Sequence, residues 1–158
     1  MNADGTGTPT HLTTFGNWPA WSPNGTQIAF SSDNKIWLMD VSAPANAHQV
    51  GACSRPGNGG TIDVVWSPGP KILFAGYVDA KSSYEIFTCD PTASGGVGSG
   101  LIRLTTSARQ DFEPSWSFDG NNIAWYSGRS PAGIWVMDAF GTSPTPIIAG
   151  GRQPSWGK

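Results

Sequence analysis

Short stretches in which apolar and polar residues alternate recur along this chain, and each is followed by a turn. The clearest stretch is residues 114–127, where Asp119-Gly120 separates two alternating segments and predicts a strand, a tight turn and a second strand. Related stretches occupy residues 19–32 and 64–74, and residues 154–156 begin a fourth copy. The chain is therefore built from repeats, and the repeat predicts the fold.

Each repeat contains four predicted strands. In chain order, these strands cover residues 18–22, 27–31, 35–41, 48–50, 62–67, 71–77, 84–89, 101–104, 113–117, 122–127, 133–137 and 145–149. No segment combines a helical period with a capping residue. Residues 1–6 match residues 137–142, so three repeats span 136 positions, or about 45 residues each. That period is typical of β-propeller blades.

The predicted fold is all-β: a β-propeller of four-stranded antiparallel blades, forming one arc over residues 1–158. We expect blades at about 15–50, 61–105 and 111–149. Residues 1–14 are expected to be the outer strand of a preceding blade and 150–158 the inner strand of a following blade. Propellers close with about four to eight blades, and an open arc exposes apolar blade faces that need a partner. We therefore expect another chain, most simply a second copy, to complete a ring of six to eight blades.

Tryptophan recurs at one position of the predicted inner strand. We expect these large rings to fill the wedge between neighbouring blades; they are Trp21, Trp66, Trp116 and Trp156. Trp18 differs, because the aligned residues are polar in the other copies: Asp63, Glu113 and Gln153. Trp18 is therefore predicted at the surface, where it either faces a ligand or partner or packs locally.

The composition excludes several classes of function. Charged residues make up 13% of the chain and the net charge is −2, which argues against the basic stripe of a nucleic-acid-binding protein. No apolar run approaches the roughly 18 residues of a membrane helix, and the first residues lack the pattern of a signal peptide. Low charge with abundant Ser, Thr, Gly and Trp favours a periplasmic or extracellular protein.

The two cysteines are expected in different surroundings. Cys89 aligns with Met39 and Met137 of the other repeats, which predicts a small buried apolar residue. Cys53 lies in a Gly-rich connection. A disulfide between Cys53 and Cys89 is the less favoured alternative, because a core-facing thiol rarely meets one in a loop.

Catalytic and metal-binding patterns are absent from the sequence. The histidines, His11 and His48, lie on predicted outer strands, and there is no nucleophile elbow or phosphate-binding loop. An Asp follows the third strand of each repeat, which predicts a turn capped by its own side chain; a calcium site is the alternative. These residues are Asp40, Asp90 and Asp138. We expect no enzymatic activity, metal or cofactor.

The loops at one end of the blades are the candidate binding surface. They combine mixed charges with aromatic rings, as recognition surfaces do, although a merely solvated set of loops would look the same. The candidates are Asn17, Trp18, Asp111, Phe112, Glu113, Arg129 and Arg152.

The third repeat carries a spaced pattern of Asp111, Pro114-x-Trp116-Ser117, Asp119-Gly120 and Ile123-Ala124, followed by residues 134–137 and by Leu-Thr ends such as Leu104-Thr105. This pattern resembles the TolB-type β-propeller repeat over nearly the whole chain. The second repeat departs from it, because it lacks the proline and the Asp-Gly turn. The resemblance implies a propeller that is usually six-bladed and serves as a periplasmic or secreted protein-binding module, or stands beside a hydrolase domain.

Three functions follow as hypotheses. The leading one is a non-enzymatic propeller module for protein–protein interaction or self-assembly. The second is a propeller fragment of a larger secreted hydrolase or peptidase. The third is a carbohydrate-binding module with Trp18 and Phe112 as stacking platforms.

Overall fold

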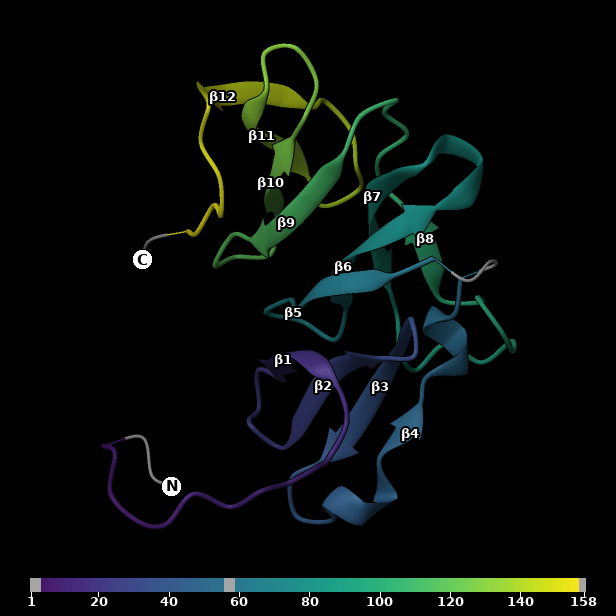
Figure 1. Cartoon of the computed structure of the whole chain (residues 1–158), viewed down its shortest axis with the longest axis vertical. Coiled ribbons are helices and arrows are strands. Elements are labelled where there is room, and N and C mark those ends of the chain that lie inside the picture. Colours follow the sequence, from purple (N-terminus) through teal and green to yellow (C-terminus); the bar gives the residue numbers. More distant parts are fainter. Residues whose placement is uncertain (1–3, 56–58, 157–158) are drawn as a thin grey trace.

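The chain forms three four-stranded antiparallel sheets that stack face to face along an arc (Figure 1). The computed structural model describes residues 4–55 and 59–156. The first sheet contains β1 (Asn17–Trp21), β2 (Gln27–Ser32), β3 (Lys35–Asp40) and β4 (His48–Gln49). The second contains β5 (Thr61–Trp66), β6 (Ile72–Val78), β7 (Ser83–Cys89) and β8 (Leu101–Arg103). The third contains β9 (Asp111–Trp116), β10 (Asn122–Ser127), β11 (Gly133–Asp138) and β12 (Thr145–Ala149).

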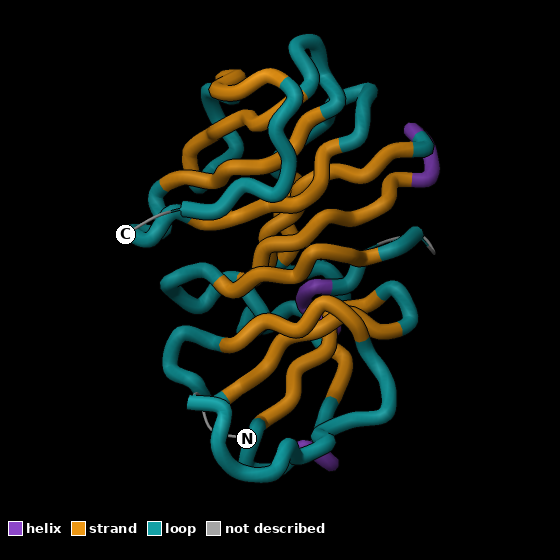
Figure 2. The backbone as a smooth tube through the Cα atoms, turned by 60° about the vertical axis from the view of Figure 1, so that its left-hand side comes forward, coloured by secondary structure: helices purple, strands orange, loops and turns teal. Residues whose placement is uncertain are grey.

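The strands of every sheet are hydrogen-bonded in chain order, so each sheet is one meander and one predicted blade. The inner strands β1, β5 and β9 lie toward the hollow of the arc, and the outer strands β4, β8 and β12 lie on its outside (Figure 1). Figure 2 shows the same stack of strands from a second direction, with loops at both ends of the strands. The helical segments are three single 3-10 turns, namely η1 (Pro44–Asn46), η2 (Gly51–Cys53) and η3 (Asp79–Lys81). The all-β propeller architecture predicted from the repeats is confirmed.

A serine at the end of each inner strand stabilises the hairpin that joins this strand to the second strand of its sheet. Ser117 Oγ accepts a hydrogen bond from the Asn122 backbone N–H at 2.9 Å and donates one to the Asp119 carboxylate at 2.6 Å. Gly120 follows with a φ of 72°, a left-handed conformation in which glycine has no steric penalty. The tight turn therefore ends one strand and starts the next within a few residues.

Two apolar clusters hold the sheets together. The first lies between sheets one and two and includes Ile36 and Leu38 of β3 and Phe74 of β6. The second lies between sheets two and three and includes Leu73 of β6 and Trp125 of β10. The middle sheet therefore has both faces covered by another sheet.

The two end faces of the arc have no sheet over them among the described residues. On the first sheet, Ile28, Phe30 and Met39 form a third cluster that is covered only by loop residues such as Leu12. Phe15 contacts Phe30 at a ring-centroid distance of 5.7 Å. Residues 4–16 contain no strand, although a strand was expected there, because no strand among the described residues is placed to pair with them. Whether they belong to a preceding blade stays a prediction.

The inner-strand tryptophans differ in burial according to their neighbours. Trp116 is 8% exposed and packs into the cluster between sheets two and three, and Trp66 is half-buried against the cluster before it. Trp21 is 57% exposed, because the described residues place no sheet over this face of the first sheet. The wedge prediction is confirmed for Trp66 and Trp116 and is wrong for Trp21.

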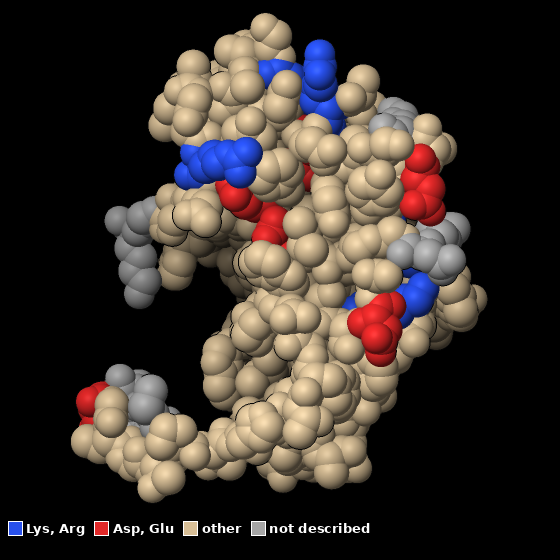
Figure 3. Space-filling model, viewed as in Figure 1, with Lys and Arg blue, Asp and Glu red and all other residues tan. Residues whose placement is uncertain are grey.

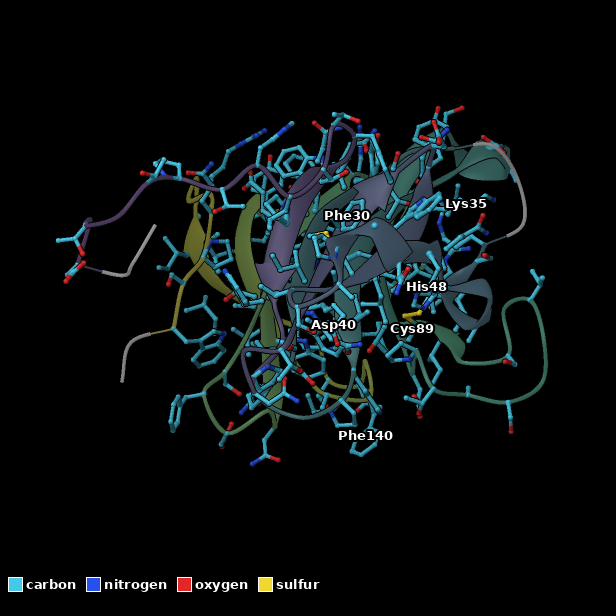
Figure 4. The ribbon with its side chains drawn as sticks, turned by 90° about the horizontal axis from the view of Figure 1, so that it is seen from below. Phe30, Lys35, Asp40, His48, Cys89 and Phe140 are labelled. Atoms are coloured by element: carbon cyan, nitrogen blue, oxygen red, sulfur yellow. A yellow bond between two sulfur atoms is a disulfide. The ribbon has the colours of Figure 1, made fainter. Side chains whose placement is uncertain are left out.

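Cys53 and Cys89 form a disulfide with a Cα–Cα distance of 5.4 Å, so the expectation of unpaired thiols is wrong. Cys53 was expected in a loop apart from the core-facing Cys89, but η2 turns Cys53 inward until it is 2% exposed. It meets Cys89 of β7, which is buried as predicted, in the cluster between sheets one and two (Figure 4). The bond ties the connection between the first two sheets to the middle sheet.

We expect removal of this disulfide to lower the free energy of unfolding by about 2–4 kcal/mol, because the bond restricts the unfolded chain. Urea unfolding of wild type with and without reductant measures the loss. The Cys53→Ala/Cys89→Ala double variant serves as the control and should not respond to reductant. A wild-type midpoint that is equally high under reducing conditions would contradict this role.

Trp116 and Trp21 offer a matched pair, since they occupy the same repeat position with different burial. Trp116→Ala should cost about 3–5 kcal/mol of unfolding free energy through lost apolar contacts and a cavity. Trp21→Ala should cost less than about 1 kcal/mol in dilute protein, as exposed substitutions do. Equal losses in denaturant titrations would show that the sheets do not stack as described.

Candidate interaction surfaces

One residue of each inner strand adopts a left-handed backbone conformation without being glycine. The φ values are 56° at Trp18, 54° at Asp63, 56° at Glu113 and 51° at Gln153. These are the four aligned positions that the sequence singled out as polar in three copies. In β1, β5 and β9 the residue lies in a break of the pairing register, which is a β-bulge.

The bulges of successive repeats are joined by hydrogen bonds. The Asp63 carboxylate Oδ2 accepts the Glu113 backbone N–H at 2.8 Å. The Glu113 carboxylate Oε2 accepts the Gln153 backbone N–H, also at 2.8 Å. We call this chain of contacts from Asp63 through Glu113 to Gln153 the inner ladder. It fixes the register of one inner strand against the next, and it offers a reason for retaining the strained conformation.

Trp18 occupies the first position of the series but has no carboxylate. Its side chain is 48% exposed, as the sequence predicted, and neighbouring Asn17 is exposed as well. An indole ring cannot accept the backbone N–H of the next bulge. The inner ladder therefore starts at Asp63.

The inner ladder brings the carboxylates of Asp63 and Glu113 close together, where both are partly buried. Burial raises the pKa of Asp63, and the nearby Glu113 charge raises it further, while the hydrogen bond from the Glu113 N–H works in the opposite direction. Ionised Asp63 is thus less favourable in the folded chain than in water.

Residues 151–156 lie over the open face of the third sheet. The Arg152 guanidinium stacks 5.0 Å from the centre of the Phe112 ring and 4.5 Å from that of Tyr126. It also lies 3.7 Å from Glu113 Oε1. The Trp156 indole N–H donates to the Ser115 carbonyl at 3.2 Å. Three predicted site residues, Phe112, Glu113 and Arg152, therefore meet here.

Asp111 and Arg129 were predicted in the loop surface, but they form a separate ion pair between a buried carboxylate and a half-buried guanidinium. Asp111 is 0% exposed, and its Oδ2 accepts from Arg129 at 2.8 Å. The guanidinium lies 5.6 Å from the Trp125 ring and 5.1 Å from the Trp135 ring. The prediction of Asp111 as a surface residue is wrong, because its strand begins inside the contact between sheets two and three.

A second buried carboxylate, Glu85 of β7, is not among the site residues predicted from the sequence. It binds Arg103 at 3.0 Å and accepts from the Thr105 hydroxyl at 2.6 Å. Burial raises its pKa, and so does the charge of Asp111. The aligned residues, Lys35 and Gly133, differ in type, so the repeat gave no signal for this site.

The recurring Asp residues after the third strands cap their own turns, as predicted. Asp90 Oδ1 accepts from the Thr92 backbone N–H at 2.8 Å and from the Thr92 hydroxyl at 2.7 Å. These bonds lower the pKa of Asp90. Asp40 and Asp138 make the same kind of turn. Within residues 4–55 and 59–156, no group of three His, Cys, Asp or Glu side chains could hold a metal ion.

The ends of the inner strands border a shallow groove of about 410 Å³. Its aromatic lining residues are Trp21, Trp66, Trp116 and Phe118. Figure 3 shows a hollow in the molecule between the N-terminal segment and the upper sheet, with few charged side chains around its lower part. None of the described helical segments has the length or apolar character to cross a membrane.

We expect Asp63→Asn to be at least as stable as wild type at neutral pH, because the amide oxygen still accepts the Glu113 N–H. The folded pKa of Asp63 is raised above 3.8, so its ionisation destabilises the native state as pH rises through that raised value and has no effect well below 3.8. The variant's advantage should therefore shrink on acidification.

Thermal unfolding across about pH 3 to pH 7 tests this sign. Asp40→Asn is the matched control with the opposite expectation, because hydrogen bonds from Ser42 lower the pKa of Asp40. An Asp63→Asn variant that loses stability relative to wild type as pH rises would refute the assignment.

Comparison with solved structures identifies the architecture. TolB from Acinetobacter baumannii superposes with a TM-score of 0.62 at 22% identity, covering 85% of this chain and 33% of that one. An oligogalacturonate lyase in complex with manganese gives a TM-score of 0.68 at 11% identity, covering 87% and 42%. The Cps50 (Swd1) β-propeller domain of Myceliophteria thermophila gives 0.58 at 13% identity, covering 84% and 41%.

This chain thus spans between a third and less than half of the length of these three chains. No family model matches the sequence. At these identities the similarity concerns the fold, and it includes both a TolB protein and a protein named as a lyase. The chain therefore has a TolB-like β-propeller fold.

Proposed function

We propose that the chain is a non-enzymatic binding module that engages protein, including a second copy of itself, through the open faces of its end sheets. One observation carries the proposal. On the first sheet, Trp21 is 57% exposed, and Ile28 and Phe30 are covered only by loop residues, whereas the equivalent Trp116, Ile123 and Trp125 are buried beneath the middle sheet. An apolar face of this kind favours association.

The charged side chains support binding over catalysis. The most buried carboxylates, Glu85 and Asp111, are both paired with arginine, and Asp63 is used in the inner ladder. His48 lies at the exposed outer strand, where its Nδ1 is 3.2 Å from the Asn46 carbonyl. This arrangement favours structural roles for these groups, since a general base must reach a substrate.

Two alternative functions receive different support from the structure. A propeller portion of a larger secreted hydrolase or peptidase agrees with the chain's spanning only part of the chains it resembles. A carbohydrate-binding module is less favoured, because Arg152 covers the Phe112 ring that was to be one of its platforms. A catalytic domain in the same open reading frame would favour the first alternative.

The disulfide bears on the compartment. Structural disulfides persist in oxidising surroundings and are rare in the cytosol. The buried Cys53–Cys89 bond therefore supports a periplasmic or extracellular location, in agreement with the low charge of the chain.

Sedimentation velocity over a concentration series tests the proposal. We expect wild type to associate with rising concentration, and Trp21→Glu to weaken this by placing a charge on the open face. Phe140→Glu is the control, because Phe140 is 79% exposed at the rim and away from the sheet faces (Figure 4). Wild type that stays monomeric into the high-micromolar range would contradict self-association.

A further inference from the structure

Residues 151–156 sit on the third sheet as an inner strand sits on the sheet before it. Gln153 repeats the left-handed conformation, and its N–H binds Glu113 as the Glu113 N–H binds Asp63. Gly151 packs so closely that an added Cβ would lie 2.9 Å from Ile134. The segment thus lies where the inner strand of a following sheet would lie.

The same segment aligns without a gap with residues 16–21, which include β1. Residues 16–21 read Gly-Asn-Trp-Pro-Ala-Trp and residues 151–156 read Gly-Arg-Gln-Pro-Ser-Trp, so glycine, proline and tryptophan share their places. The third residue is left-handed in both, with φ values of 56° and 51°. Whatever surface accepts residues 151–156 is therefore shaped to accept β1.

We propose that the open face of the third sheet is a docking site for β1 of a second copy, and that residues 151–156 of the same chain compete for it. This proposal rests on the proposed function and specifies that β1 of one copy contacts the third sheet of the other. In the docked state, Glu113 accepts the Trp18 N–H of the second copy, and Trp21 of that copy covers Ser115. Two copies joined head to tail at both ends make a closed ring of six sheets, within the range of propellers.

The segment of residues 151–156 is only partly buried on the third sheet. Residues 151–156 pair with no strand, Trp156 is 37% exposed, and the Arg152 side chain is 57% exposed. In contrast, β1 is paired with β2, so it brings the whole first sheet against the third, including the exposed rings of Trp21 and of Phe15, which packs on Phe30. A second copy would therefore cover apolar surface on both partners, which the tethered segment cannot do.

Tethering nevertheless favours the chain's own segment, because a short linker gives an effective concentration in about the millimolar range. Weakening the segment should unmask the site. The chosen variant of the full chain is Arg152→Ala/Trp156→Ala, which removes the stacking on Phe112 and the bond to Ser115. Gln153→Pro is a second route, because proline has no N–H to donate to Glu113 and cannot adopt the left-handed φ of 51°.

The probe is a labelled synthetic peptide of residues 15–21, with a scrambled peptide as its control. We expect the segment-weakened variants to bind it about tenfold more tightly than wild type, and Phe140→Ala to bind it like wild type. Adding Glu113→Ala should remove most of this gain. Sedimentation of the same variants should show stronger self-association than wild type.

Thermal melts establish that each variant is folded. Unchanged peptide affinity in both weakened variants, or weaker self-association than wild type, would overturn the proposal while leaving self-association itself intact. Tighter peptide binding without any gain in self-association would overturn the assignment of a second copy as occupant. Absence of association in every variant would overturn the proposed self-association as well.

Discussion

Each sheet of this chain has two apolar faces, and burying both of them is the constraint on which the structure depends. The middle sheet satisfies it, with Phe74 directed to one neighbour and Leu73 to the other. The end sheets satisfy it with loops, in which Leu12 and Arg152 cover what a sheet covers elsewhere. A single four-stranded sheet cannot bury both of its apolar faces, so the sheets of this chain stack on one another.

The inner ladder adds direction to this stacking. Apolar faces alone would let sheets slide, since dispersion and the hydrophobic effect are not directional. A carboxylate that accepts the N–H of the next bulge fixes both the order and the register of neighbours. Asp63 and Glu113 do this within the chain, and Trp18 cannot act as such an acceptor. The first sheet is therefore suited to follow another sheet, and the third is suited to precede one.

The sequence predicted the strands well because turn residues and alternation are local signals, as at Ser117 and Gly120. It predicted Trp18 at the surface because its aligned partners are polar. It could not predict the left-handed bulges, since nothing marks them except a place in the repeat, nor the Asp111–Arg129 pair, which forms only on folding. The disulfide was misjudged because Cys53 lies in a turn-rich loop whose inward direction depends on η2.

Native-state hydrogen exchange of the backbone amides tests the central claim most directly, because it reports the stability of each sheet separately. The account predicts that β6 and β7 of the middle sheet are protected most. It also predicts that protection of β2 and β3 is lower in dilute protein and rises with concentration as the open face is covered. Uniform protection of all three sheets that does not change with concentration would contradict it.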